Sequence, residues 1–203
     1  MKVKNPEQIE AFRQRILKCA KTIISQEGLE QLSIRKIANM LEYTPGIIYH
    51  YFKDKDAILY EITKEGYMEI LQIIKHHMDP SAPPQDVLIN TLRAYMQGML
   101  KQADIFLLLM LSTDPKVEAQ VNILKENIRE ERASMQALCN ILEAGVDQGV
   151  FQCEHIELRA QAIWCATFGM IQRIVKEKID GEYQMLLIEE HLRMIKDSLE
   201  VRC

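Results

Sequence analysis

Apolar residues recur at spacings of three and four along most of the chain, which is the pattern of helices that bury one face. The first such segment begins at Asn5-Pro6-Glu7 and continues to about Gly28. Its apolar positions lie on one face: Ile9, Phe12, Ile16, Ala20 and Ile23. Prolines and glycines separate the later segments. We therefore predict an all-α fold of about nine helices.

Cap residues and prolines set the expected helix boundaries. Ser33, Thr44 and Asp54 are each placed to cap a helix, and the proline-rich segment 80–84 stops the helix that Asp54 begins. After the first helix, the expected helices cover residues 34–41, 45 to about 51 or 52, 55 to the proline-rich segment, 85–101, 104–111, Asp114-Pro115 to Gly145 or Gly149, 154–179 and 183–200.

The second and third helices, joined by a turn at Glu42-Tyr43, form a predicted helix-turn-helix. In the third, Ile48 and Phe52 are four residues apart and share the buried face. The rest of its circumference carries two phenols and an imidazole, those of Tyr49, Tyr51 and His50. Such a helix end suits a groove with phosphates on its rims. The alternative is that the rings form a small satellite core.

Charge is distributed unevenly along the 203 residues, which are 48% hydrophobic and carry a net charge of −4. Residues 1–60 hold ten Lys and Arg against seven Asp and Glu, whereas residues 61–203 hold fifteen against twenty-two. A slightly basic N-terminal segment followed by an acidic remainder is typical of a chain in which only the N-terminal part binds phosphate groups. The alternative is that the charge difference between the two parts is a chance variation in surface composition.

Several classes of site are not expected. The sequence has no apolar leader and no apolar stretch of membrane-spanning length, so we expect a cytoplasmic protein that contacts no membrane. Five cysteines without a C-x-x-C spacing indicate neither a disulfide framework nor a zinc site. Glycine-rich nucleotide motifs, G-x-S-x-G and H-E-x-x-H do not occur, and the neighbours His76 and His77 point about 100° apart on a helix. We expect no catalytic residue, metal or cofactor.

Three pieces of the sequence, in this order, resemble the tetracycline-repressor-like (TetR) family of transcriptional regulators: RILKCAKTIISQEG, LSIRKIANML and TPGIIYHYFKDKDAIL. They are similar to the family's first helix, its second helix, and its recognition helix followed by a lysine-led fourth helix. The resemblance implies a three-helix DNA-binding domain at residues 1–53 and a larger helical bundle for ligand binding and dimerisation at residues 54–203. The family usually has a glycine in the turn where this chain has Glu42, and a glutamate resists a positive φ and repels phosphate.

The resemblance also implies roles for single residues. Arg35 is expected to contact a base or phosphate, His50 likewise, and Lys55 to pair with a phosphate. Ser33 is expected to contact the DNA backbone. The residues expected to face the major groove are Thr44, Pro45, Gly46 and Ile47, and those expected to donate hydrogen bonds to phosphate are Tyr49 and Tyr51.

Large, flexible apolar side chains are frequent in the body of the chain, and methionines adapt to varied guests, so we predict a pocket for a small, largely apolar ligand. The predicted lining is Tyr67, Met68, Leu71, Tyr95, Met96, Met99, Phe106, Met110, Leu124 and Met135. The alternative is that these residues are ordinary core.

The last two helices carry a predicted dimer interface. Small residues at spacings of four and three allow close helix approach, and an apolar ridge follows on the next helix. The residues are Ala162, Ala166 and Gly169, then Leu187, His191, Met194 and Ile195. Together these predictions indicate a homodimeric regulator that binds double-stranded operator DNA, with repression implied by the resemblance. An enzyme on a helical bundle and a helical interaction protein without DNA binding are the alternatives.

Overall fold

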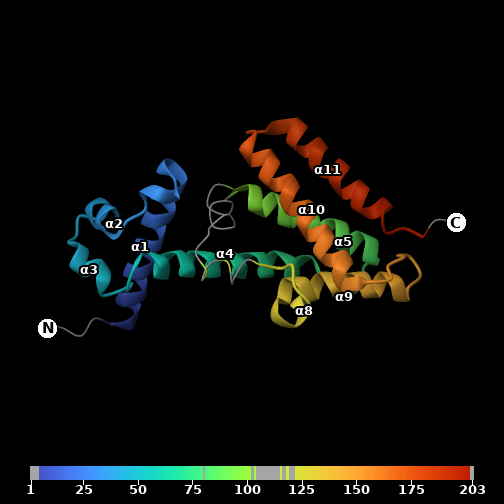
Figure 1. The fold of residues 1–203 in the computed structure, drawn as a ribbon, viewed down its shortest axis with the longest axis horizontal. Helices are drawn as coiled ribbons and strands as arrows, with labels where there is room; N and C mark the ends of the chain where they lie inside the picture. The colour runs from blue at the N-terminus through green and yellow to red at the C-terminus, as the bar shows by residue number, and fades with distance from the viewer. Residues whose placement is uncertain are drawn as a thin grey trace. The chain divides into compact units, whose positions relative to one another are not determined.

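The computed structural model describes residues 5–79, 81–101, 103, 115, 118 and 122–201. The fold is all-α, as predicted (Figure 1). Its helices are α1 (Pro6–Glu27), α2 (Ile34–Met40), α3 (Pro45–Tyr49), α4 (Lys55–His77), α5 (Pro84–Lys101), α8 (Ile128–Glu131), α9 (Ala133–Asp147), α10 (Ile156–Lys176) and α11 (Gly181–Asp197), with a short 3-10 helix, η1, at Leu29–Gln31. Within these residues, no helix is long and apolar enough to cross a bilayer.

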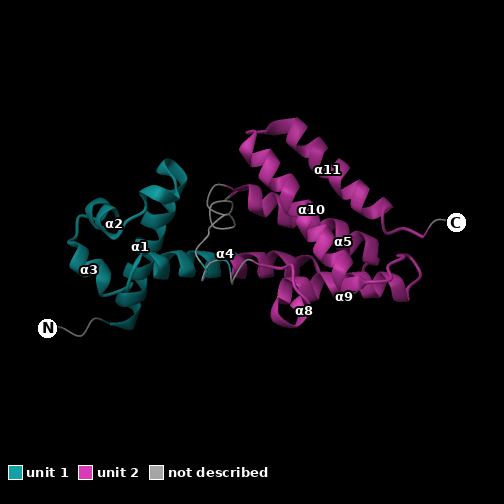
Figure 2. Ribbon diagram, in the orientation of Figure 1, with its two compact units in different colours: residues 1–66, 104–121 teal, residues 67–103, 122–203 magenta. Residues whose placement is uncertain are grey.

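The chain divides into two compact units (Figure 2). Of the described residues, unit 1 comprises 5–66, 115 and 118, and it holds α1, α2, α3 and the first part of α4. Unit 2 is built on residues 67–101 and 122–201 and holds the rest of α4 with α5 and α8 to α11.

Three helices of unit 1 begin at the predicted side-chain caps, whereas Thr44 precedes α3 without a side-chain cap hydrogen bond. The side chain of Asn5 accepts a hydrogen bond from the Glu7 amide, and Ser33 Oγ accepts one from the Lys36 amide at 3.2 Å. Asp54 Oδ1 accepts one from the Ala57 amide at 2.8 Å, which fixes the start of α4. Each bond satisfies one of the amides that the first turn of a helix leaves unpaired.

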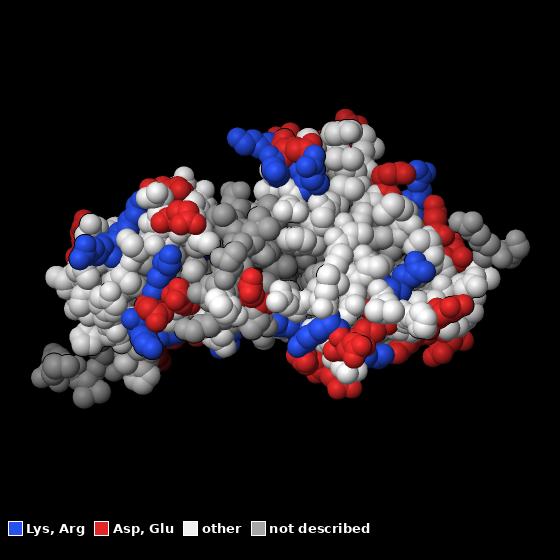
Figure 3. Space-filling view, viewed as in Figure 1, with Lys and Arg blue, Asp and Glu red and all other residues white. Residues whose placement is uncertain are grey.

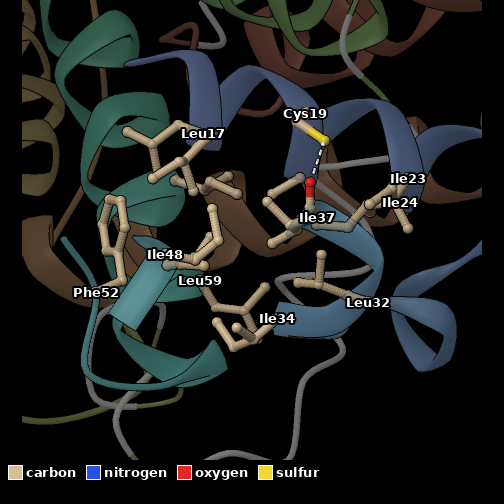
Figure 4. Packing of buried hydrophobic residues seen from close by; sticks show 14 of the residues in the cluster. Leu17, Cys19, Ile23, Ile24, Leu32, Ile34, Ile37, Ile48, Phe52 and Leu59 are labelled. Atoms are coloured by element: carbon tan, nitrogen blue, oxygen red, sulfur yellow. Dashed lines mark hydrogen bonds between the residues drawn. The ribbon is translucent and has the colours of Figure 1, made fainter. Parts of the chain in front are cut away.

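One apolar core joins the helices of unit 1 (Figure 4). Ile16 of α1, Ile37 of α2, Ile48 of α3 and Ile58 of α4 are all fully buried in it. The Cys19 thiol of α1 donates a hydrogen bond to the Ile37 carbonyl of α2, with a sulfur–oxygen distance of 3.9 Å. Since α3 has only five residues, too few for a stable isolated helix, this packing is what keeps it helical.

The turn between α2 and α3 places Glu42 at a φ of 60°, in the left-handed region. Residues with a Cβ rarely adopt this conformation. The amide of Glu42 donates to the Asn39 carbonyl and that of Tyr43 to the Ala38 carbonyl, at 3.1 and 2.9 Å. Glu42 therefore adopts a backbone conformation that is unfavourable for a residue with a Cβ. The two hydrogen bonds of the turn stabilise this conformation.

Unit 2 is a helical bundle in which α5, α9, α10 and α11 pack on one another. Two glycines allow close approach within it. A Cβ on Gly98 of α5 would lie 2.6 Å from the Ile73 side chain of α4, and one on Gly145 of α9 would lie 1.9 Å from the Phe151 ring. Phe151 is buried, so its ring occupies the space that a side chain at Gly145 would need.

The prediction of one unbroken helix from Asp114-Pro115 to Gly145 or Gly149 is wrong at residues 122–127 and at Arg132. Residues 122–127 are not helical, and α8 and α9 are separate helices on either side of Arg132. Asn127 adopts a left-handed φ of 58°, which asparagine tolerates better than most residues. Tertiary contacts hold the break, since Ile128 is fully buried and Arg129 binds Glu143 with two hydrogen bonds of 2.7 and 3.0 Å.

The regular part of α3 ends at Tyr49, and the two following residues form a turn rather than a last helical turn. The helix expected at 104–111 lies outside the described residues.

Candidate DNA-binding and ligand sites

Residues at the start of α2 and in α3 form the candidate DNA-binding surface of unit 1. Ser33, Arg35, Thr44 and Gly46 are exposed, whereas Pro45, Ile47 and Lys55 are half-buried. Ser33 is also occupied as the cap of α2, so its hydroxyl already accepts one hydrogen bond from the protein. A Cβ on Gly46 would meet nothing closer than the Thr44 hydroxyl at 3.9 Å, so the helix start is open to solvent.

The ring cluster behind α3 is divided between surface and core. Tyr49 is 56% exposed and His50 is exposed as well. Phe52 is buried in the core of unit 1, and Tyr51 is half-buried with its ring 4.8 Å from that of Phe12. Both predictions for the ring cluster therefore hold in part. The side chains of Tyr49 and His50 are exposed and can reach a ligand, whereas those of Tyr51 and Phe52 pack in unit 1.

Arg13 of α1 holds the chain where α3 ends. Its Nη1 donates to the Tyr51 carbonyl at 2.8 Å, and its guanidinium lies over the Phe52 ring, 4.3 Å from the centroid. Its Nη2 also lies 3.8 Å from a carboxylate oxygen of Glu61 on α4. One side chain thus ties α1 to the end of α3 and to α4, which orients the exposed face of α3. The sequence reasoning did not assign Arg13 a role.

The cations of unit 1 differ in how far they are neutralised. Lys36 pairs with Glu27, and Lys21 with Glu65 at 2.9 Å. Among the residues that the structure describes, Arg35, Lys53 and Lys55 pair with no carboxylate. Figure 3 shows cations and carboxylates interspersed on one face of the unit. The unpaired cations, together with the exposed phenol and imidazole, supply hydrogen-bond donors for phosphate and base edges.

The predicted ligand residues are scattered over unit 2. Met96, Met99 and Met135 are buried, Leu71 is half-buried, and Met68 is half exposed. Leu124 is 71% exposed, and the ring of Tyr67 has the Arg132 guanidinium over it at 5.7 Å. Phe106 and Met110 lie outside the described residues. Among the described members of the predicted set, Tyr95 lines the small cavity described next.

A cavity of about 20 Å³ lies among α4, α5, α9 and α10, which is room for about one water molecule. Its lining is Ile74, Leu88, Thr91, Leu92, Tyr95, Ser134, Leu138, Ile141 and Trp164. The rings of Tyr95 and Trp164 contact each other, with centroids 4.8 Å apart. The sequence reasoning missed Thr91 and Trp164. The signal available was the i, i+4 pair Thr91 and Tyr95 on one helix face, with the chain's single tryptophan.

The predicted dimer residues of α10 and α11 lie partly on the surface. Ala162, Ala166 and Met194 are exposed, and Gly169 and Leu187 are half-buried. His191 and Ile195 are each only 3% exposed, because they pack inside their own chain, with His191 Nε2 3.0 Å from the Thr167 hydroxyl. Burial lowers the pKa of His191 below its usual value. Further large apolar side chains are exposed on the same two helices: Leu158, Tyr183, Met185 and Leu186.

No cluster of three or more metal-ligating side chains occurs in the described part of the chain. The ring of His77 is used locally, because its Nδ1 lies 2.9 Å from the Ile73 carbonyl. Cys19 and Cys139 are buried, and burial raises the pKa of both thiols.

The chain is similar to known regulators in sequence and in structure. The sequence profile described as "Bacterial regulatory proteins, tetR family" matches residues 16–62. The HTH-type transcriptional regulator HbdR of Aromatoleum sp. (strain CIB) is 30% identical over 194 residues, which cover 94% of this chain and 85% of HbdR. The fatty acid metabolism regulator protein of Bacillus subtilis (strain 168) is 23% identical, over 93% of this chain and 92% of its own. A solved tetR-family regulatory protein from Rhodococcus RHA1 aligns with a TM-score of 0.73 at 22% identity, over 94% of this chain and 98% of that one.

Proposed function

Because the chain belongs to the tetR family of bacterial regulatory proteins, a family of DNA-binding regulators and not of enzymes, we propose that it is a homodimeric repressor released from its operator by a small, largely apolar ligand. The observation that carries the proposal is the exposed face of α2 and α3. Arg35, Gly46, Tyr49 and His50 are exposed there on helices whose opposite faces are buried. Cationic and phenolic side chains on a helix that the core holds in place can bind the base edges of a major groove and the phosphates beside it.

Selection of bound duplexes from a random pool tests DNA binding directly, and a pseudo-palindromic product is expected. Affinity should fall steeply with salt as counterions are released from phosphate. Arg35→Ala and Tyr49→Phe should each weaken binding by about 1–3 kcal/mol. Tyr60→Phe is the matched control, since Tyr60 is also an exposed phenol of unit 1 but lies on α4. A double Arg35, Tyr49 variant that is folded and binds like the wild type would exclude this surface.

The exposed faces of α10 and α11 support the proposed dimer. Monomeric proteins rarely leave several neighbouring large apolar side chains in water. Two copies can pair these helices about a two-fold axis as a four-helix bundle, and the symmetry matches a palindromic operator. Leu186→Glu should therefore shift the protein toward monomer in sedimentation. Leu124→Glu, at an exposed leucine outside α10 and α11, should not. Equal sedimentation of both variants and the wild type would locate the interface elsewhere.

The cavity in unit 2 supports a ligand-responsive domain. Its lining is mostly apolar, and the relative from Bacillus subtilis is named as a regulator of fatty acid metabolism. Ile74 near the end of α4 lines the cavity, whereas Lys55 begins the same helix in the DNA-binding unit. Coupling between sites is reciprocal, and about 1–3 kcal/mol is typical. Operator DNA should thus weaken ligand binding by the factor by which the ligand weakens operator binding; equal ligand affinity with and without operator would refute the switch.

A further inference from the structure

Three residues that line the cavity of unit 2 carry a buried polar group with no hydrogen-bond partner among the described residues. The groups are the Thr91 hydroxyl, the Tyr95 hydroxyl and the Trp164 indole N–H. Each of the three residues is more than nine-tenths buried. An unpaired buried polar group is destabilising, because it loses its hydrogen bonds to water and gains none in the fold. Three of them at one cavity form a cluster that the protein's own fold leaves unsatisfied.

The chemistry of the three groups defines what would satisfy them. An indole N–H can only donate, so Trp164 needs an acceptor. The hydroxyls of Thr91 and Tyr95 can donate to the same acceptor, and burial raises the pKa of Tyr95, which keeps its phenol protonated. A carbonyl oxygen has two lone pairs in a broad acceptor region, so more than one of these donors can share it.

The rest of the lining restricts the ligand further. Ile74, Leu88, Leu92, Leu138 and Ile141 are apolar, and no side chain lining the cavity within the described residues carries a charge. A carboxylate or ammonium buried there would have no oppositely charged side chain, and neutral donors alone offset little of the cost of removing a charge from water. The acceptor must therefore be uncharged, and the groups attached to it apolar.

We propose that the ligand is an apolar molecule that carries one uncharged hydrogen-bond acceptor, such as a ketone, ester or amide carbonyl, held by Trp164, Tyr95 and Thr91. The inference rests on the proposed ligand-responsive function and specifies the chemistry of its ligand. Because the cavity has room for only about one water molecule, a larger guest has to push the lining side chains apart. This requirement gives the occupied and empty states different shapes, which a ligand-controlled switch needs.

The experiment uses the full-length protein and probes with a common five-membered ring: cyclopentanone, cyclopentene and cyclopentanecarboxylate. Trp164 is the chain's single tryptophan, so its indole N–H gives one resonance that reports on the cavity alone. Cyclopentanone should bind and move this resonance downfield, as a new hydrogen bond requires. Cyclopentene should bind several-fold more weakly without the downfield shift, and the carboxylate should not bind.

Two variants test the hydroxyls. Tyr95→Phe and Thr91→Val should each weaken cyclopentanone binding roughly three- to tenfold, the loss expected for one neutral hydrogen bond. They should leave the thermal stability of the empty protein unchanged or raise it, because an unsatisfied buried hydroxyl is removed. Tyr60→Phe, which removes an exposed phenol from the part of α4 in unit 1, should change neither property.

Three results would overturn the proposal. They are cyclopentene binding as tightly as cyclopentanone, the carboxylate binding more tightly than the ketone, and Tyr95→Phe lowering stability while ketone affinity stays unchanged. The last result would mean that the hydroxyl has a structural partner, such as a buried water. None of these readouts involves DNA. Failure of operator selection would remove the proposed function alone, whereas failure of the ketone in a protein that selects an operator would remove this inference alone.

Discussion

Replacing Glu42 by glycine should stabilise unit 1 by about 0.5–1 kcal/mol. Glu42 adopts a φ of 60°, and left-handed backbone costs a residue with a Cβ roughly 1–2 kcal/mol. Glycine removes that cost but loses about 0.5–1 kcal/mol more backbone entropy on folding, and the difference is the expected gain. The two backbone hydrogen bonds of the turn do not involve the side chain, so the substitution keeps them.

Urea unfolding followed by far-UV circular dichroism measures the gain. Fluorescence of Trp164, which lies in unit 2, follows the other unit in the same samples and should be unaffected. Glu42→Ala is the control, since it removes the carboxylate but keeps the Cβ and hence the strain. Only the glycine variant should be stabilised, whereas both should bind operator more tightly at low salt because a charge that repels phosphate is gone. Equal unfolding midpoints for the two variants would show that the turn stores no strain.

Other substitutions probe single contacts. Gly145→Ala should destabilise unit 2 by about 1–3 kcal/mol through its clash with the Phe151 ring, whereas Gly66→Ala, with open space around it on α4, should stabilise by about 0.5–1 kcal/mol in thermal unfolding. Asp54→Ala removes the cap of α4 and should cost about 0.5–2 kcal/mol, a loss that an asparagine at the same position should largely avoid. The lowered pKa of His191 means that the folded chain binds its proton less readily than the unfolded chain, so stability should fall as pH drops below about 6.5. His191→Gln, which cannot titrate, should show a flatter decline between pH 7 and 5 if this residue is responsible.

Local chemistry allowed much of the fold to be predicted from sequence. Asn5, Ser33 and Asp54 cap helices where expected, because capping depends on a few neighbouring residues. The break before α9 was missed, because neither proline nor glycine marks it and the burial of Ile128 is a tertiary effect. Nor could spacing alone separate the inward from the outward residues of α11, since apolar side chains occur on both of its faces.

In the candidate sites, too, local features were predictable from the sequence and tertiary features were not. The exposed and buried faces of α3 follow from helical spacing, so Ile48 and Phe52 were correctly assigned to the core. The cavity was not predictable, because Thr91 and Trp164 are 73 positions apart in sequence and meet only when α5 and α10 pack. A methionine-rich composition indicates soft packing but does not say where space remains.

The two faces of α3 also bear on how such a regulator can evolve. Ile48 and Phe52 anchor the helix from within, while Tyr49 and His50 stand in solvent and contribute little to the core. Surface substitutions of this kind usually change stability by less than about 0.5 kcal/mol. Mutation can therefore change the side chains at the positions proposed to face DNA without compensating changes in the core. If this face reads the operator as proposed, a duplicated copy of the gene can acquire a different operator in a few steps while it keeps the same fold and the same C-terminal domain.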